Sequence, residues 1–424
     1  MLCASAASAQ WSIVATVIDG GGESIVRDMQ EFNGDLFVAG DFTHIDSNNA
    51  HCQLSFRFDG TNIIRQLVPF TGTGIEKMAV YNDQLLAVGT IRNSADSTHG
   101  VATWQDTTWA NTPSPIPEGT VPDLYSLASF GGDLFVAGRF YEAPFRHIAR
   151  SEGSGYVDVN GGFDNAVFDL EVYNGELYAG GEFHFPWEDG NAQWVARWDG
   201  SQWQELGPGL GYYVTDMEVF DGALYIAGKF GPDHLLKWDG DTLTPVGGGI
   251  TVSSMASYID RLILKATSEG LYIAGNVTSA DGIPVEGLAV WDGSNWHDPG
   301  ALPDPDLRIT AIEEYQGHVY AAAFHEGYPV YERSSTLYRK EVVLPVVETL
   351  AEEFRAFPNP VSDVLHTTGT MPGILPFVIC DVVGRTIKAG AFTGSVAVGD
   401  LPAGRYLLTL TSKDRTQRTA FIKR

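Results

Sequence analysis

Histidines and carboxylates recur in one kind of loop along the chain, directly after a Gly-x-Phe triplet or its equivalent. The candidates are His44 and Asp46, His184 and Glu188, Asp233 and His234, and His325 and Glu326. Imidazoles and carboxylates grouped in loops could bind a divalent cation or a sugar. Polar side chains also belong in exposed loops, so a solvated surface without a ligand is the competing interpretation. The sequence therefore indicates a candidate ligand-binding face and leaves its metal unknown.

The sequence contains no local motif of a common enzyme class. A Gly-x-Ser-x-Gly elbow, a phosphate-binding glycine loop, a His-Glu-x-x-His pair and a cysteine cluster are all absent from it. Cys52 and Cys380 stand far apart, so we expect lone thiols and no disulfide framework. We predict no catalytic residue and no cofactor other than a divalent cation in the loops described above.

The candidate loops belong to a unit that recurs seven times and is clearest at Val172–Trp203. Each unit contains a small-residue apolar strand, and the closing residues of these strands are Gly40, Gly89, Gly138, Gly181, Gly228, Gly275 and Ala323. Successive closing residues are 43 to 49 positions apart. This period, with four strand-like segments per unit, is typical of propeller blades. The sequence thus predicts an all-β chain with a seven-bladed β-propeller over residues 10–343.

Two turns of the unit carry Gly after a polar residue. The first turn is Asn33-Gly34, Asn174-Gly175, Asp221-Gly222 or Gln316-Gly317, and the third is Asp59-Gly60, Asp199-Gly200, Asp239-Gly240 or Asp292-Gly293. Such pairs supply the positive φ angles of tight hairpins, so we expect these aspartates to form turns and not to bind metal. Aromatic pairs straddle the third turn at Trp104/Trp109, Trp198/Trp203 and Trp291/Trp296, which predicts packing across adjacent strands.

The two ends of the repeat region leave its closure open. Gln10–Ile18 has the pattern of an outer strand whose unit is completed by the seventh repeat, and Thr336–Val343 could occupy the same place. Residues 1–9 end in Ala7-Ser8-Ala9, which has the small-residue character of an export cleavage site. We interpret them as the residual end of an export signal, with an ordinary small-residue terminus as the alternative. No apolar run approaches the roughly 18 residues of a membrane span.

Charge is divided unevenly along the chain. Residues before Phe354 include 17 basic and 49 acidic residues, whereas the residues from Phe354 onward include 9 basic and 4 acidic ones. A strongly acidic surface disfavours nucleic acid and anionic membranes as partners. Diffuse solvation explains the surface, and weak association with cations is the alternative.

The C-terminal part departs from the repeat. We interpret residues 344–353 as a linker and residues 354–424 as a small antiparallel Ig-like β-sandwich, because short alternating strands are separated by turn residues. Its motif residues are Pro358, Asn359, Pro360 and Asp363, then Asp381, Gly384 and Arg385, then Gly404, Tyr406 and Lys423.

Those motif residues resemble the C-terminal, type A sorting domain of type IX secretion cargo from Bacteroidota. The resemblance implies secretion to the outer-membrane surface or the extracellular space. It also implies that the type IX translocon recognises the tail. In that family a sortase usually removes the tail and can attach the cargo to surface lipopolysaccharide. A plain Ig-like module is the alternative.

The repeats resemble kelch-type propeller repeats, which host many functions. We therefore expect a non-catalytic binding or adhesion module that acts on extracellular glycan, other polymer or protein through its loop face. An extracellular hydrolase or lyase is the alternative, because propellers assemble active sites from several blades. A purely structural surface protein is the third hypothesis.

Overall fold

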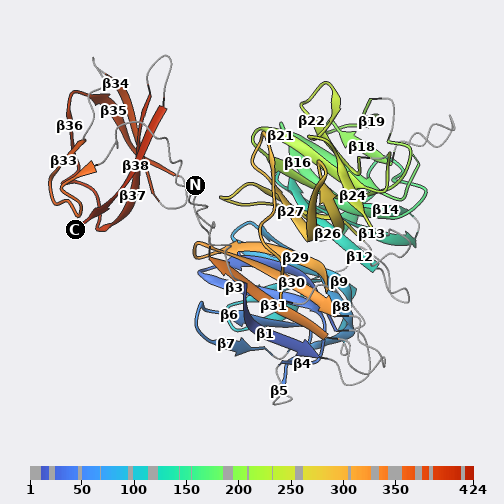
Figure 1. Ribbon diagram of the computed structural model, residues 1–424. Helices are drawn as coiled ribbons and strands as arrows, with labels where there is room; N and C mark the ends of the chain where they lie inside the picture. The colour runs from blue at the N-terminus through green and yellow to red at the C-terminus, as the bar shows by residue number, and fades with distance from the viewer. Residues whose placement is uncertain are drawn as a thin grey trace. The chain divides into compact units, whose positions relative to one another are not determined.

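The computed structural model divides the chain into two compact units, residues 1–343 and 344–424 (Figure 1). It describes residues 11–18, 24–45, 50–66, 68–93, 99–112, 123–142, 144–153, 155–184, 194–207, 210–231, 233–253, 261–303, 307–325, 334–341, 356–367, 375–381, 385–411 and 416–424. The expected signal remnant and linker lie outside these residues. All regular structure in them is β-strand, so none of their segments is a helix that could cross a membrane.

Seven antiparallel sheets, numbered here in the chain order of their first strands, make up the described part of the first unit. Sheet 1 is β2 (Ile25–Phe32), β3 (Asp35–Asp41), β6 (Ser55–Phe58) and β7 (Ile63–Arg65). Sheet 2 is β8 (Phe70–Tyr81), β9 (Gln84–Asn93), β10 (His99–Gln105) and β11 (Thr108–Asn111). Sheet 3 is β12 (Asp123–Phe130), β13 (Asp133–Glu142), β14 (Phe145–Glu152) and β15 (Gly155–Val157). Sheet 4 is β16 (Val167–Tyr173), β17 (Glu176–Gly181), β18 (Val195–Trp198) and β19 (Trp203–Glu205).

The remaining three sheets vary this plan. Sheet 5 is β20 (Val214–Phe220), β21 (Ala223–Gly228), β22 (Leu235–Trp238) and β23 (Leu243–Pro245). Sheet 6 is β26 (Leu271–Ala280), β27 (Ile283–Trp291) and β28 (Trp296–His297), with β24 (Ile250–Val252) and β25 (Ile263–Ala266) both paired to β26. Sheet 7 is β29 (Leu307–Tyr315), β30 (His318–His325), β31 (Ser334–Glu341) and β1 (Ser12–Ile18), extended by β4 (His44–Ile45) and β5 (Ala50–His51).

The first strands of the sheets contact one another in cyclic order. Strand β2 contacts β8, the order continues through β12, β16, β20, β25 and β29, and β29 contacts β2 again. An apolar cluster lies between every pair of successive sheets, including sheets 7 and 1. Because each sheet buries both faces against neighbours, its strands are apolar on both sides. The first unit therefore has a propeller-like β fold.

Both segments considered for closure take part in sheet 7. Strand β31 pairs with β30, and β1 pairs with β31 through Ile13↔Tyr338 and Thr16↔Thr336. Strand β4 then pairs with β1, although β4 comes from the loop between β3 and β6 of sheet 1. The N-terminal strand is thus held between the end of the repeat region and a neighbouring sheet.

A β-bulge in most first strands explains the closing glycines. In sheet 3 the pairing shifts between Leu124 and Ser126, and Gly138 lies opposite Leu124. A Cβ atom at Gly138 would be 2.0 Å from the carbonyl oxygen of Asp123. Only glycine permits this close approach of two backbones. The bulge re-aims the next side chain toward the ring centre.

The turn and aromatic predictions are confirmed. Asn33 and Gly34 have φ angles of 52° and 85°, as a tight hairpin requires. In the third turns Asp199 Oδ1 accepts from the amides of Ser201 and Gln202, and the other three aspartates behave alike. Trp198 and Trp203 lie directly opposite each other with ring centroids 5.2 Å apart, and the other two tryptophan pairs do the same.

The second unit consists of two antiparallel sheets around one apolar core. One sheet is β32 (Ala356–Phe357), β33 (Val364–Thr367) and β36 (Ser395–Ala397). The other is β35 (Thr386–Phe392), β34 (Leu375–Cys380), β37 (Gly404–Thr411) and β38 (Thr416–Lys423). Buried residues from both sheets form the core. Cys380 here and the buried Cys52 in the first unit are both reduced thiols, as the sequence predicts.

Candidate functional site

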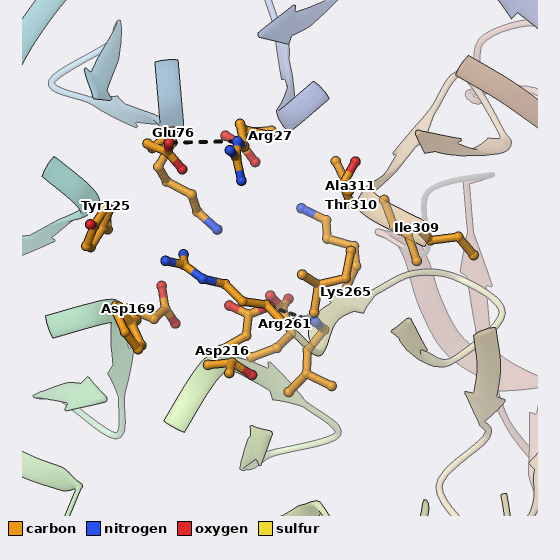
Figure 2. A pocket seen from close by; sticks show the side chains of 18 residues that line it. Arg27, Glu76, Tyr125, Asp169, Asp216, Arg261, Lys265, Ile309, Thr310 and Ala311 are labelled. Atoms are coloured by element: carbon orange, nitrogen blue, oxygen red, sulfur yellow. Dashed lines mark hydrogen bonds and ion pairs between the residues drawn. The ribbon is translucent and has the colours of Figure 1, made fainter. Parts of the chain in front are cut away.

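The first strands surround a cavity of about 120 Å³ that is lined by residues from all seven sheets. This volume corresponds to roughly four water molecules at about 30 Å³ each. It has room for waters or one small substituent. Figure 2 shows the side chains of Asp169, Asp216, Arg261 and Lys265 gathered around this space.

One strand position, twelve residues before the closing residue, supplies a lining residue of the cavity from every sheet except sheet 3. It is occupied in turn by Asp28, Lys77, Ser126, Asp169, Asp216, Ile263 and Ala311. In six of the seven sheets a shift in the pairing of the first and second strands directly precedes this position. The local backbone irregularity therefore selects which residue of an otherwise apolar strand reaches the cavity.

The aspartates at this position bind the backbone of the next sheet. Asp28 Oδ2 accepts from Met78 N at 2.6 Å, and Asp216 Oδ2 accepts from Leu264 N at 2.6 Å. Asp169 accepts from Met217 N at 3.0 Å through one oxygen and from the Ser126 hydroxyl at 3.1 Å through the other. These carboxylates connect successive sheets around the ring, which is a structural role.

Lys77 is the one cation among the seven residues at this strand position. Burial lowers the pKa of Lys77, but the carboxylates of Asp28, Asp216 and Asp169 outweigh that effect and raise it. In the described part of the chain Lys77 makes no ion pair or hydrogen bond, so it is stabilised by the field of the carboxylates and not by direct contact. Burial raises the pKa of Asp216, and the neighbouring Asp169 raises it further.

Two arginines lie at the end of the cavity that receives the loops between sheets. Arg27 forms an ion pair with Glu76 at 3.7 Å, marked by a dashed line in Figure 2. The guanidinium of Arg261 lies over the rings of Phe168 and Tyr125, at 4.6 and 5.1 Å from their centroids. Burial lowers the pKa of Arg261, and Arg27 lowers it further. This end, which we call the cavity mouth, therefore carries two guanidinium groups and one carboxylate.

Two residues further along the first strands the ring interior is rich in carboxylates, of which Glu218 lines the cavity. Glu313 pairs with Lys265 at 2.6 Å, and Glu218 accepts from Ala266 N at 3.3 Å. Burial raises the pKa of Glu171 to about 8, with Asp169 and Glu218 adding to the shift. Glu171 is thus the group in this part of the ring interior whose charge changes near neutral pH.

An aromatic surface is formed by residues of the β17–β18 connection within sheet 4 and of the β19–β20 connection that follows it. The rings of Trp194 and Tyr212 stack with centroids 5.4 Å apart and planes 21° apart, and Tyr212 is 43% exposed. His184 contacts Trp194 at 4.8 Å, and Lys229 Nζ is 5.2 Å from the Tyr212 centroid. Tyr213 joins this surface to the cavity mouth, because it contacts both Tyr212 and Phe168.

The structure separates the histidines and carboxylates predicted as a ligand face. His184 Nδ1 donates to Asp164 Oδ2 at 3.0 Å, and the imidazole joins the aromatic surface. His44 contacts the Thr43 hydroxyl at 2.8 Å on β4, and His234 contacts the Gly228 carbonyl at 3.1 Å. The backbone carbonyl of Asp233 accepts from Ile250 N at 3.0 Å. His44 lies on β4, whereas Asp233 and His234 lie together directly before β22. No contact joins either place to His184 in the described part of the chain.

The other predicted loop residues are placed as follows. His325 ends β30 and pairs with Leu307 and Ser334. Asp46, Glu188 and Glu326 lie outside the described residues. Among the residues that the structure does describe, no group of three or more histidine, cysteine or acidic side chains could hold a metal ion. The predicted ligand face and its cation thus stay predictions, and among the described candidates His184 is the one that contacts the aromatic surface.

The cavity residues are the set that sequence reasoning missed. A signal exists, because a charged residue stands twelve positions before the closing residue in four of the seven repeats. In an apolar strand with no polar face, such a residue has to point into a shared interior or pair with a neighbour. The aromatic partners Trp194 and Tyr212 gave no comparable signal, since they come from loops of unequal length.

The motif residues of the second unit mainly organise its turns and edges. Asp381 binds the amide and Nε of Arg385 at 2.9 and 2.8 Å. Asn359 accepts from Ile422 N at 2.8 Å, which ties the Pro358–Pro360 segment to β38. The Tyr406 hydroxyl donates to the Pro402 carbonyl at 3.0 Å.

The other motif residues of this unit lie along its strands and turns. Gly404 pairs with Lys423, and the Asp363 carbonyl accepts from Val398 N at 2.7 Å. Gly384 lies outside the described residues.

Solved structures similar to the chain are remote from it in sequence. The extracellular domain of a putative one-component system from B. thetaiotaomicron has a TM-score of 0.48 and 9% identity, over 95% of this chain and 57% of that one. The extracellular domain of a putative hybrid two-component system from the same organism has a TM-score of 0.44 and 9% identity, over 95% and 55%. The polysaccharide lyase Uly1 has a TM-score of 0.37 and 12% identity, over 77% and 91%. This chain spans less than two thirds of the length of the two B. thetaiotaomicron domains.

Sequence comparison is informative for the second unit. No curated protein matches the chain. Residues 355–424 match the family described as a secretion system C-terminal sorting domain, which agrees with the motif residues above. This domain implies an interaction with the type IX secretion machinery. The protein is therefore type IX secretion cargo, directed to the cell surface or the extracellular space.

Proposed function

We propose that the seven sheets are the blades of a seven-bladed, kelch-like propeller that binds a glycan or another extracellular polymer without catalysis. The second unit, an Ig-like sandwich in this proposal, delivers the propeller to the translocon and is then removed by a sortase. The observation that supports the binding role best is the aromatic surface formed by Trp194 and Tyr212.

The chemistry of this surface suits a sugar ring. The exposed ring of Tyr212, held by stacking on Trp194, offers apolar surface to the C–H groups of a sugar, and aromatic rings lose little conformational entropy on binding. The imidazole of His184, oriented by Asp164 at 3.0 Å, and the ammonium of Lys229 lie beside the rings as hydrogen-bond donors or acceptors for hydroxyl groups. A few polar groups around an apolar platform are typical of ligand sites.

The experiment is a binding assay of the full chain on an array of extracellular glycans and matrix polymers. We expect saturable binding to at least one polymer, and a loss of at least tenfold in affinity for Trp194→Ala and for Tyr212→Ala. The control variant is Ile13→Ala, which removes an exposed hydrophobic residue from the outer strand β1 and should leave affinity unchanged. Absence of saturable binding, or equal affinity of all four proteins, would contradict the proposal.

A second candidate function is an extracellular hydrolase or lyase with its active site in the cavity. Carboxylates converge there, and the raised pKa of Glu171, about 8, suits a general acid. Against it, Asp169, Asp216 and Glu218 already accept backbone amides. Release of shortened products from a bound polymer, abolished by Glu171→Gln, would establish this alternative in place of the first.

A further inference from the structure

Two cations of the cavity wall have no counter-ion in contact. Neither Lys77 nor Arg261 makes an ion pair in the part of the chain that the structure describes. Burying a charge without a contacting partner costs free energy, and such groups are found mainly at binding or catalytic sites. The two cations therefore differ from Lys265 and Lys340, which contact Glu313 and Glu269 at 2.6 and 2.9 Å.

The carboxylates near these cations already accept hydrogen bonds from backbone amides or pair with another cation. Asp28 and Asp216 each hold a backbone amide of the next sheet at 2.6 Å, and moving either one toward Arg261 would leave that amide unsatisfied. Glu76 pairs with Arg27 at 3.7 Å. The charges of Arg27, Glu76 and Arg261 at the cavity mouth thus sum to +1, and Arg261 is the cation among them without a contacting counter-ion in the described residues.

The setting of Arg261 leaves its hydrogen-bond donors available. Its guanidinium lies over the faces of Phe168 and Tyr125, at 4.6 and 5.1 Å, and stacking engages the plane of the group and not its N–H edge. A planar fork of N–H donors matches the two oxygens of a carboxylate or sulfate. The cavity volume of about 120 Å³ admits such a substituent.

We propose that the cavity mouth is a subsite for an oxyanion, a carboxylate or sulfate substituent of the bound polymer, held by the guanidinium of Arg261. This inference rests on the proposed glycan-binding function and names its ligand class as an acidic glycan. The sugar rings would lie along Tyr212 and Tyr213, which lead from Trp194 to Phe168 beside Arg261.

The negative charge of the whole chain, −27, does not prevent this binding. Charges farther than about 8 Å apart in physiological salt are largely screened, whereas charges inside a walled cavity are screened much less. Local cations therefore decide what binds at the mouth, and the acidic surface only slows the approach of the ligand.

The experiment compares two probes that differ only in charge, trigalacturonate and its methyl-esterified form, titrated calorimetrically into the full chain. We expect the acid to bind at least tenfold more tightly than the ester. Arg261→Gln should abolish this preference and leave affinity for the ester unchanged, and Arg261→Lys, which keeps the charge, should retain part of the preference. Arg150→Gln is the matched control, because Arg150 forms an exposed pair with Asp133 at 3.3 Å and its loss changes the net charge equally.

Each outcome decides the inference separately from the proposed function. Equal binding of acid and ester, or an unchanged preference in Arg261→Gln, would overturn the oxyanion subsite while the aromatic surface could still bind neutral glycan. If neither trisaccharide binds, sodium acetate and sodium sulfate are titrated at constant ionic strength. Arg261-dependent binding of acetate identifies a carboxylate site and of sulfate a sulfate site, and both would support the subsite although the trisaccharide was wrong. Absence of both would overturn it.

Discussion

The inner and outer ends of the sheets use the same residue types under opposite conditions. At the outer turns Asp199 and Asp239 are exposed, and backbone amides lower the pKa of each carboxyl. At the inner strands Asp28 and Asp216 also accept backbone amides, yet burial raises the pKa of both. Desolvation therefore outweighs hydrogen bonding where the ring closes around the cavity. The same repeat thus contains a solvated aspartate at its outer turn and a buried carboxyl group at its inner strand.

Glycine substitution should give the largest difference between the two ends. Gly138→Ala places a Cβ atom 2.0 Å from a backbone carbonyl, which demands movement of β12, so we expect the free energy of unfolding to fall by more than about 4 kcal/mol. Gly200→Ala, at an outer turn with φ of 100° and open space around it, should cost only about 1–2 kcal/mol. Urea unfolding followed by tryptophan fluorescence measures both. Equal losses would show that the inner approach is not constrained as described.

The second prediction concerns pH. Glu171 has its pKa raised from 4.5 to about 8 in the folded protein, so between these values the folded protein keeps a proton that the unfolded chain has released. The free energy of unfolding should therefore fall as pH rises through this window. At pH 8 and above, Glu171→Gln should stabilise the protein by about 3 kcal/mol, allowing for its partial exposure, and flatten the profile.

The outer turns should respond with the opposite sign. The lowered pKa of Asp239 means that its contribution is present above the ordinary value of 3.8 and is lost as pH falls through the folded value. Asp239→Asn should change only this acid limb of the profile. A Glu171→Gln variant with the wild-type slope between pH 5 and 8 would refute the account of the inner end.

The smallest of the three stability effects should come from single aspartates. Asp216→Ala leaves the amide of Leu264 without an acceptor and should cost about 2 kcal/mol, reduced by relief of repulsion with Asp169. Asp216→Asn keeps an acceptor oxygen and should recover most of this loss. Asp199→Ala at an outer turn should lower the melting temperature less than Asp216→Ala does. Thermal unfolding of the three variants ranks them, and a reversed ranking would break the comparison.

Local rules of sequence made the outer ends predictable. Asp199-Gly200 marks its hairpin because glycine adopts the positive φ and the carboxylate caps the turn, and Trp198 and Trp203 follow from strand register. The sheet count, the closing glycines and the sorting motif are local or periodic in the same way. The spacing of residues in the sequence was therefore sufficient to predict the all-β, propeller-like fold.

The inner end and the aromatic surface depend on contacts between distant segments. Lys77 acquires its environment from Asp28, Asp169 and Asp216, which only ring closure brings together. His184 was predicted as a ligand residue, but its contact with Trp194, and the contact of Trp194 with Tyr212, join segments that local sequence does not relate. His44 and His234 were predicted on the same grounds and lie elsewhere, because loop composition does not determine which loops meet.

The central claim is that the loop face binds an extracellular polymer without changing it. The most direct measurement takes one labelled oligosaccharide that the full chain binds, incubates it with wild type and Trp194→Ala, and follows both bound fraction and chain length by mass spectrometry. The account predicts saturable binding that Trp194→Ala weakens at least tenfold, with the oligosaccharide recovered at its original length. Shortened product, or binding that ignores Trp194, would contradict it.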